Sequence, residues 1–270
     1  MALFEIRYLS KEMRMSTSVT VILPDMSVPE NGFPTLYLLH GFSGDDKDWL
    51  RFTRIEEYAG QRGIAVVMPC GYNSAYTNMR YGMNYFSYLA DELPKYLRSI
   101  LPLSRDREKN FVCGDSMGGY GAMKWALSRP DFFGAVCSMS GSLRVQDRME
   151  GKSANSGNQC AGMYGDPPEI IVEEQDLFFM LQKLCEKKAP LPRIFCCCGK
   201  ADKPHIYGAY LNFVKHARSL GVPVKSSEKE NAAHTWDYWN FMLPETLDWM
   251  LEPIQSQQHR EKMILSAALP

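Results

Sequence analysis

The sequence lacks the features that would direct it to nucleic acid or to a membrane. No run of Lys and Arg reaches five residues and the formal net charge is -1, so the footprint of a nucleic-acid-binding protein is absent. No apolar segment approaches the roughly 18 residues of a membrane span. Glu5 and Arg7 interrupt what would be the apolar stretch of a signal peptide. We therefore expect no membrane partner and a cytoplasmic location.

Metal and nucleotide motifs are also missing. The chain has eight cysteines but no C-x-x-C pair, and no H-E-x-x-H pattern, which argues against zinc-ribbon, thioredoxin and zinc-protease sites. Consecutive residues 196–198 are all Cys and would alternate between the faces of a strand, a poor metal cage. Neither a P-loop nor a dinucleotide fingerprint is present. We expect reduced, buried thiols, no metal and no cofactor.

Short apolar runs alternate with segments of helical periodicity. Residues 3–9 and 17–23 predict an opening antiparallel hairpin. Buried strands are expected at 35–40, 64–69, 110–114, 134–140, 193–199 and 222–228, and helices at 84–101 (divided or kinked at Pro94), 116–128, 169–187, 205–220 and 235–251. This alternation predicts an α/β fold, a mostly parallel central sheet with helices on both faces.

The apolar fraction of 45% is enough for one large core, and we expect a single domain over residues 1–253. Residues 254–270 form a tail with a weak helical pattern. Residues 142–168 are rich in Gly, Ser, Asn and Asp, and predict a loop without regular structure. It follows a strand end, so it is either a small lid or a mobile surface loop.

The strongest motif is G-x-S-x-G at residues 114–118, which contains Ser116. A strand is predicted just before it and a helix just after it, the arrangement that a nucleophile elbow requires. The glycines allow a sharp turn that leaves the hydroxyl exposed above the sheet. A Gly-rich structural turn is the alternative, but the context favours Ser116 as a nucleophile.

A nucleophilic serine needs a histidine base, which in turn needs an orienting acid. His234 lies in a short loop after the strand at 222–228 and before a helix, which is where the base of such a fold belongs. Asp202 follows the strand at 193–199 and can reach that loop. The alternatives are a structural histidine and a helix N-cap. A histidine base also predicts a rate that falls below about pH 6–7.

An oxyanion that forms during such chemistry needs preorganised amide donors. The amide of Met117, directly after the nucleophile, is one candidate, and that of Phe42 in the loop after residues 35–40 is the other. We expect His40 to pack under this loop. Trp49, Tyr85 and Trp236 are candidate contacts for an acyl or aryl group, although single aromatic residues belong more often to the core.

Five segments together resemble the esterase D family of α/β-hydrolases. They are TLYLLHGFSGDDKDWLR, MRYGMNYFSYLADELP, GDSMGGYGAMKWAL, GKADKPH and AAHTWDYWN, and the resemblance runs from about residue 35 to 250. These segments are similar to those of bacterial tributyrin esterases and feruloyl (cinnamoyl) esterases. The resemblance implies an α/β-hydrolase fold, catalysis without a cofactor, and a triad at Ser116, Asp202 and His234. Asp115 departs from the family, whose members often carry Leu or His there.

The predicted function is a serine carboxylesterase that hydrolyses short-chain acyl or hydroxycinnamoyl esters through an acyl-enzyme. Its partner would be a small-molecule ester, aryl or carbohydrate-linked, and homo-oligomer formation stays open. The alternatives are a thioesterase of the S-formylglutathione hydrolase type, an acetyl-xylan esterase, and a non-catalytic binding protein with the same fold. An intact Ser, Asp and His in the expected order argues against the last of these.

Overall fold

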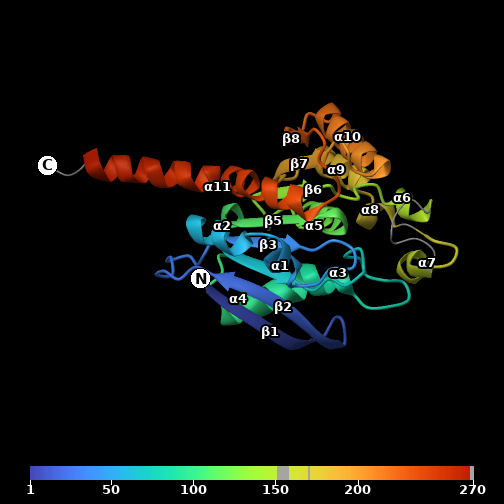
Figure 1. The fold of residues 1–270 in the computed structure, drawn as a ribbon, viewed down its shortest axis with the longest axis horizontal. Helices are drawn as coiled ribbons and strands as arrows, with labels where there is room; N and C mark the ends of the chain where they lie inside the picture. The colour runs from blue at the N-terminus through green and yellow to red at the C-terminus, as the bar shows by residue number, and fades with distance from the viewer. Residues whose placement is uncertain (151–157, 170, 268–270) are drawn as a thin grey trace.

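An eight-stranded twisted sheet forms the centre of the molecule (Figure 1). The structure is a computed structural model and describes residues 1–150, 158–169 and 171–267. The strands follow the order β1-β2-β4-β3-β5-β6-β7-β8. Their bounds are β1 Ala2–Ser10, β2 Met15–Leu23, β3 Thr35–Leu39, β4 Ala65–Pro69, β5 Asn110–Asp115, β6 Ala135–Met139, β7 Arg193–Gly199 and β8 Val224–Lys229. All eight predicted strands are therefore present.

The sheet is parallel except at its N-terminal end. β1 pairs antiparallel with β2, and β2 pairs antiparallel with β4, while all other neighbours are parallel. The predicted opening hairpin and the mostly parallel sheet are confirmed. Because parallel strands end at the same edge of a sheet, the segments that follow β3, β5, β7 and β8 meet at one edge.

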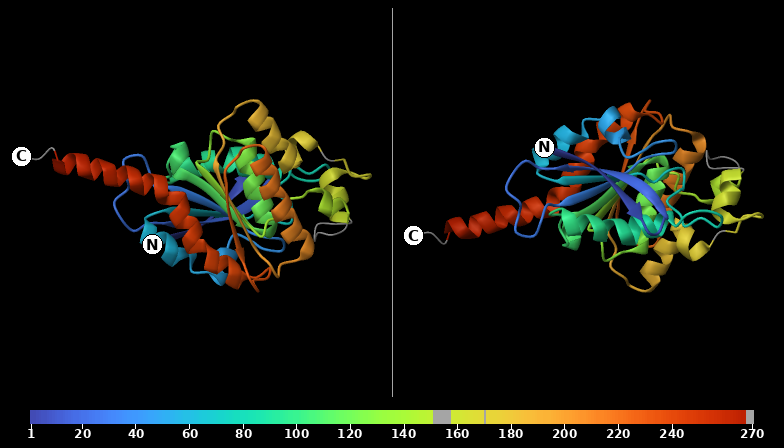
Figure 2. Two further views of the ribbon diagram at one scale, coloured as in Figure 1. Left: turned by 90° about the horizontal axis from the view of Figure 1, so that it is seen from above. Right: turned by 90° about the horizontal axis from the view of Figure 1, so that it is seen from below.

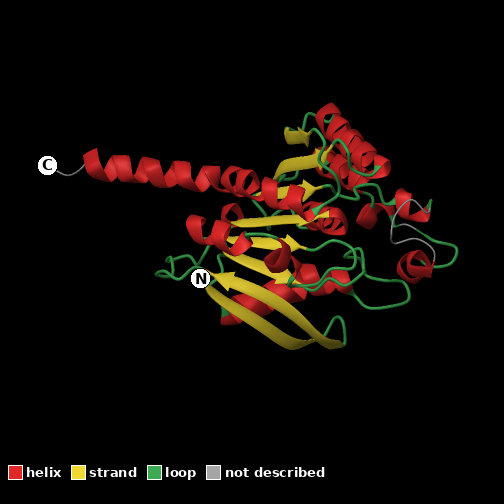
Figure 3. Cartoon of the chain, viewed as in Figure 1, coloured by secondary structure: helices red, strands yellow, loops and turns green. Residues whose placement is uncertain are grey.

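Helices cover both faces of the sheet (Figures 2 and 3). Side chains that alternate along each strand divide into two apolar clusters, as period-2 geometry requires. One cluster packs against α4 (Leu93–Ile100), α5 (Ser116–Ser128), α9 (Leu177–Glu186) and α10 (Pro204–Ser219). The other packs against α1 (Asp48–Phe52), α2 (Ile55–Arg62) and α11 (Trp236–Ala267). Cys196 and Cys198 belong to the first cluster and Cys197 to the second, as predicted.

Two predicted helices are divided. Residues 84–101 form α3 (Tyr85–Ser87), a π-helical turn η1 (Tyr88–Glu92) and α4, whose first turn contains Pro94. Residues 169–187 divide into α8 (Val172–Gln175) and α9. The break lies at Asp176, whose side chain accepts hydrogen bonds from the amides of Phe178 and Phe179 and so begins a new helix.

The segment 142–168 is not the structureless loop that its composition predicts. It contains α6 (Gln146–Met149) and α7 (Asn158–Tyr164), and Leu143 and Met163 are buried in the first cluster. Its residues 151–157 lie outside the described part of the chain. The described residues of the segment lie beyond the carboxyl ends of the parallel strands (Figure 3). The sequence did not predict these helices, because their apolar residues are few and do not recur at helical spacing.

The final helix is longer than predicted. α11 begins at Trp236, close to the expected position, and continues to Ala267 through the segment expected to be a tail. Its outer half projects away from the layered body (Figure 1). Within the described residues, no helix combines the length and apolar character needed to cross a bilayer.

Candidate active site

The nucleophile candidate sits in a sharp turn between β5 and α5. Ser116 is the first residue of α5 and has a φ of 50°, in the left-handed region. The two flanking glycines of the motif have no room for a side chain. A Cβ on Gly114 would overlap the backbone of Gly118, and one on Gly118 would overlap the carbonyl oxygen of Leu39. This tight packing of α5 on the sheet holds the Ser116 hydroxyl at the edge where the strands end.

His234 lies within hydrogen-bond distance of the Ser116 hydroxyl. Its Nε2 lies 2.9 Å from Ser116 Oγ, across 118 positions of sequence. The histidine lies in the short loop between β8 and α11, as predicted. The Trp239 ring packs edge-to-face against the imidazole at a centroid distance of 5.0 Å. This contact helps to fix the orientation of the imidazole ring.

Asp202 lies on the other side of the imidazole. Its Oδ1 and Oδ2 are 2.9 and 3.1 Å from His234 Nδ1, so Nδ1 carries the proton and Nε2 is left to accept one from Ser116. Burial raises the pKa of Asp202, but the hydrogen bond and charge of His234 outweigh it and lower the pKa below its usual range. Asp202 is not the N-cap of α10, since that position is Lys203.

Cys198 is a neighbour of Asp202 that the sequence did not reveal. Its thiol donates to Asp202 Oδ2 at 3.7 Å, from the penultimate residue of β7. The carboxylate also accepts from the Lys203 amide at 2.6 Å. The available signal was the alternation of side chains along β7, which places Cys198 on the same face of the sheet as Cys196.

The loop after β3 runs beside the elbow. A Cβ on Gly41 would overlap Oδ2 of Asp115 and lie 3.4 Å from the Cβ of Ser116, so the loop backbone lies directly against the nucleophile. Phe42 follows at half burial, and the Ser43 amide donates to Asn73 Oδ1 at 2.7 Å. Asn73 is thus a second residue that the sequence did not reveal. Met117 lies in the first turn of α5, where an amide has no carbonyl partner within its own helix.

His40 packs under this loop, as predicted. It is 1% exposed, accepts a hydrogen bond from the Gly71 amide through Nε2 at 2.8 Å, and lies 2.7 Å from the Gly41 carbonyl through Nδ1. The Tyr76 hydroxyl donates to the His40 carbonyl at 2.9 Å. Burial lowers the pKa of His40, which favours a neutral ring.

The expectation that Trp49 contacts a substrate is wrong. Trp49 is 1% exposed in the second apolar cluster, and its indole donates to the Leu39 carbonyl at 3.1 Å. Trp236 lies between this buried ring and the surface, edge-on to Trp49 at 5.1 Å and stacked on Phe52 at 5.1 Å. Tyr85 is half-buried, with its ring 5.8 Å from that of Tyr72. Residue type alone did not show which aromatic side chains face inward.

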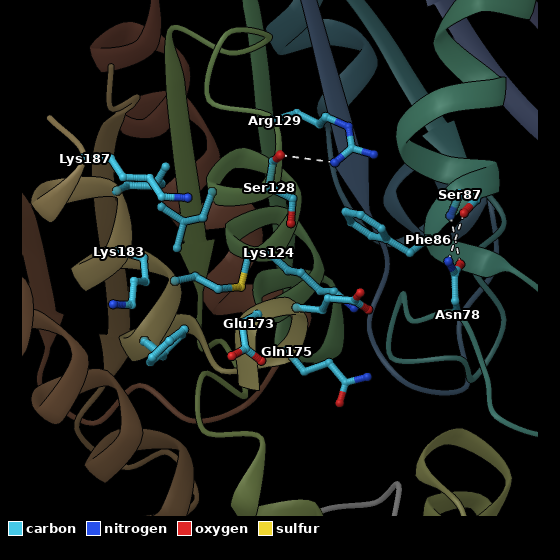
Figure 4. A pocket seen from close by; sticks show the side chains of 15 residues that line it. Asn78, Phe86, Ser87, Lys124, Ser128, Arg129, Glu173, Gln175, Lys183 and Lys187 are labelled. Carbon is cyan, nitrogen blue, oxygen red and sulfur yellow. Dashed lines mark hydrogen bonds between the residues drawn. The ribbon is translucent and has the colours of Figure 1, made fainter. Parts of the chain in front are cut away.

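A cavity of about 510 Å³ opens along the flank of α5, between α3 and α9, and Ser116 does not line it (Figure 4). Lys124 extends across it toward Phe86, with its ammonium 4.7 Å from the ring centre. That ammonium also donates to Thr77 Oγ1 at 2.7 Å. Lys183, on the opposite wall, pairs with Glu186. The cavity is therefore separate from the hydrogen-bonded chain of Ser116, His234 and Asp202.

A hydroxyl, an imidazole and a carboxylate in this order form the device that turns a serine into a nucleophile. Among the described residues, no group of three or more His, Cys, Asp or Glu side chains is arranged to hold a metal ion. Together with the sheet topology and the elbow, this chain of three side chains defines a serine hydrolase of the α/β-hydrolase fold.

The chain belongs to the family described as "Putative esterase", whose model matches residues 10–250. It is 31% identical over 265 residues to an acetyl esterase of Caldicellulosiruptor saccharolyticus, covering 93% of this chain and 98% of the relative. The solved structure of FphF, a fluorophosphonate-binding serine hydrolase of Staphylococcus aureus, superposes with a TM-score of 0.84 at 32% identity, covering 93% and 98%. The structure named S-formylglutathione hydrolase (FrmB) of the same organism gives 0.84 at 31% identity with the same coverage.

The comparisons and the fold confirm that the protein is an esterase of this family. The predicted α/β-hydrolase fold is confirmed as well.

Proposed function

We propose that the protein hydrolyses short-chain acyl esters through an acyl-enzyme formed on Ser116. The observation that carries this proposal is the distance of 2.9 Å between His234 Nε2 and Ser116 Oγ, with Asp202 bound to the opposite nitrogen. The relative named acetyl esterase supports a short acyl group. The hydroxycinnamoyl alternative rests on the sequence resemblance to feruloyl esterases, with Tyr85 and Trp236 as proposed contacts.

The reaction proceeds in two halves. His234 removes the Ser116 proton as the hydroxyl oxygen attacks the ester carbonyl, and Asp202 stabilises the resulting imidazolium. The amides of Phe42 and Met117 donate to the oxyanion of the tetrahedral intermediate. The alcohol leaves with the proton from His234. Water then attacks the acyl-enzyme with His234 again as base, and the carboxylic acid is released.

A thioester is the second candidate substrate class. The structure named S-formylglutathione hydrolase matches this chain as closely as the FphF structure does. The same nucleophile and oxyanion donors would serve a thioester carbonyl, since only the leaving group differs. The choice between the two therefore depends on the residues that contact the leaving group.

Turnover of a panel of substrates tests both the chemistry and the substrate class. The panel is p-nitrophenyl acetate, p-nitrophenyl butyrate, methyl ferulate and S-formylglutathione. We expect turnover of the acetate and butyrate, and Ser116→Ala should lower kcat/KM by at least about 10³-fold because the nucleophile is lost. Ser128→Ala, at the far end of α5, is the matched control and should retain the wild-type rate.

Each outcome of this assay has a distinct meaning. Ferulate turned over as well as butyrate would assign a hydroxycinnamoyl pocket, and preference for S-formylglutathione would assign the thioesterase. Ester turnover by Ser116→Ala at the wild-type rate would refute Ser116 as nucleophile. A fluorophosphonate probe should label the wild type and not Ser116→Ala, and a folded wild type that stays unlabelled would support the non-catalytic alternative.

A further inference from the structure

Asp115 is a buried acid that the chemistry proposed above does not use. It precedes Ser116 in the elbow and is 1% exposed. Its Oδ1 has no hydrogen-bond partner among the described residues. A buried polar atom without a partner carries a cost of roughly 1–3 kcal/mol. Such a residue in the elbow itself calls for a role.

The carboxyl group of Asp115 lies directly against the loop after β3, residues 40–44, which is called the oxyanion loop because it carries the proposed donor Phe42. A Cβ on Gly41 would overlap Oδ2, so this oxygen occupies the space beneath the Gly41 backbone. The next residue, Phe42, carries the proposed oxyanion donor. Two further contacts hold the loop, since His40 Nδ1 lies 2.7 Å from the Gly41 carbonyl and Asn73 accepts from the Ser43 amide. Asp115 is therefore one of the groups packed directly against this loop.

No positive charge faces Asp115. Within the part of the chain that the structure describes, no Lys or Arg forms an ion pair with it. The groups that face it are Asp48 from α1 and Tyr76 from the loop after β4, and His40, at the end of β3, contacts the same loop. His40 is held neutral, because Nε2 accepts from the Gly71 amide and burial disfavours its charged form. Tyr76 is an uncharged hydroxyl that donates to the His40 carbonyl.

These surroundings favour an uncharged carboxyl group. Burial raises the pKa of Asp115 well above its usual range. Hydrogen bonds from the backbone amides of Asp115 and Gly41 lower this pKa by less, and the carboxylate of Asp48 adds to the rise. A neutral buried carboxylic acid is an established solution where a negative charge would oppose the chemistry. Here a second negative charge would lie beside the oxyanion, where low dielectric makes repulsion strong.

We propose that Asp115 is held as a neutral carboxylic acid beneath the oxyanion loop and is a positioning residue for Gly41 and Phe42. The inference rests on the proposed ester hydrolysis for its kinetic consequence. The protonation state of Asp115 is a property of the folded protein alone. An amide can replace a neutral carboxylic acid in shape and in charge, but it cannot replace a carboxylate.

The protonation state is tested by an infrared difference spectrum of wild type minus Asp115→Asn at pH 7. We expect the carbonyl band of a protonated carboxylic acid in the wild type and its absence in the variant. A carboxylate band in its place would overturn the proposal. The measurement needs no substrate, so it separates failure of this inference from failure of the proposed function, which fluorophosphonate labelling of Ser116 reports.

The positioning role is tested by kcat and KM of two variants with the best ester substrate. Asp115→Ala should lower kcat by about 10- to 100-fold with little change in KM, because a loosened oxyanion loop weakens transition-state binding. Asp115→Asn should restore kcat to within about threefold of wild type. If Asp115→Asn folds but is as inactive as Asp115→Ala, the carboxylate charge is required and the proposal is wrong. If the alanine variant does not fold, Asp115→Asn is compared with the wild type, and a folded Asn variant whose kcat is lower by about tenfold or more overturns the proposal.

Discussion

Three serines with left-handed backbone lie around the proposed active site. Ser43 follows the oxyanion loop with a φ of 67°, Ser116 has 50°, and Ser140, directly after β6, has 47°. Such a conformation costs about 1–3 kcal/mol for a residue other than glycine. Strain of this kind gathers where the surrounding structure fixes the backbone for a function. The sequence alone does not reveal this backbone conformation, because contacts with residues distant in the sequence impose it.

The roles proposed for Ser116, His234 and Asp202 were available from the sequence because each depends on chain order and on a strand end. The positions of Cys198, Asn73 and Trp49 were not available. Whether a side chain reaches Asp202, the oxyanion loop or the core depends on how strands far apart in sequence are paired.

The raised pKa of Asp115 predicts a pH-dependent difference in stability between wild type and Asp115→Asn. The unfolded carboxyl group loses its proton near roughly pH 3.9. The folded one keeps it to a higher pH, so the stabilisation from this proton is complete below the unfolded value and is lost as the pH rises through the folded value. Asn has no such proton. The variant should therefore gain stability relative to wild type from about pH 4 upward.

Thermal unfolding between pH 3 and pH 9 measures this difference. Asp131→Asn is the matched control, because Asp131 is exposed. Its melting temperature should follow that of the wild type across the whole range. A constant difference between Asp115→Asn and wild type at every pH would contradict a raised pKa.

At the scale of the elements, buried apolar runs located β3 to β7 to within a residue or two. A strand buried on both faces must be apolar throughout, which makes its pattern unmistakable. The short helices of residues 142–168 had no such pattern. Leu143 and Met163 are buried there through contacts with other elements, so their neighbours in sequence give no sign of it.

The space around two helical glycines predicts opposite effects of their substitution by Ala on stability. Gly118→Ala should destabilise the protein by more than about 2 kcal/mol, because the new Cβ would overlap the fixed backbone carbonyl of Leu39. Gly208→Ala, in α10, meets no atom within 4 Å and should stabilise by about 0.5–1 kcal/mol through lower chain entropy.

Urea unfolding of both variants measures these free energies. The pair serves as its own control, since both changes add one methyl group to a glycine in a helix. Equal stability of Gly118→Ala and wild type would show that α5 can move away from the sheet.

At the scale of the whole molecule, the outer half of α11 extends beyond the layers that hold the active site (Figures 1 and 2). We propose that residues 1–253 form the hydrolase domain and that residues 254–270 are dispensable for it. A chain ending at residue 253 should keep its esterase rate. Its melting temperature should change by less than about 2–4 °C, equivalent to about 1 kcal/mol for a domain of this size.

Calorimetry and the ester assay on the shortened chain check this prediction. A chain ending at residue 243 is the contrasting control, because it removes Leu247 and Met250, which are buried in the second cluster. If the chain ending at residue 253 does not fold, residues 254–270 belong to the domain.

The backbone of Ser116 also bears on how this protein can evolve. Glycine adopts a φ of 50° without a steric cost, whereas serine does not. The easiest residue for the chain at the tip of its elbow is thus one that has no hydroxyl at all. Selection for stability alone would favour glycine at position 116 and so an inactive protein of the same fold. Only selection for the reaction retains a serine there.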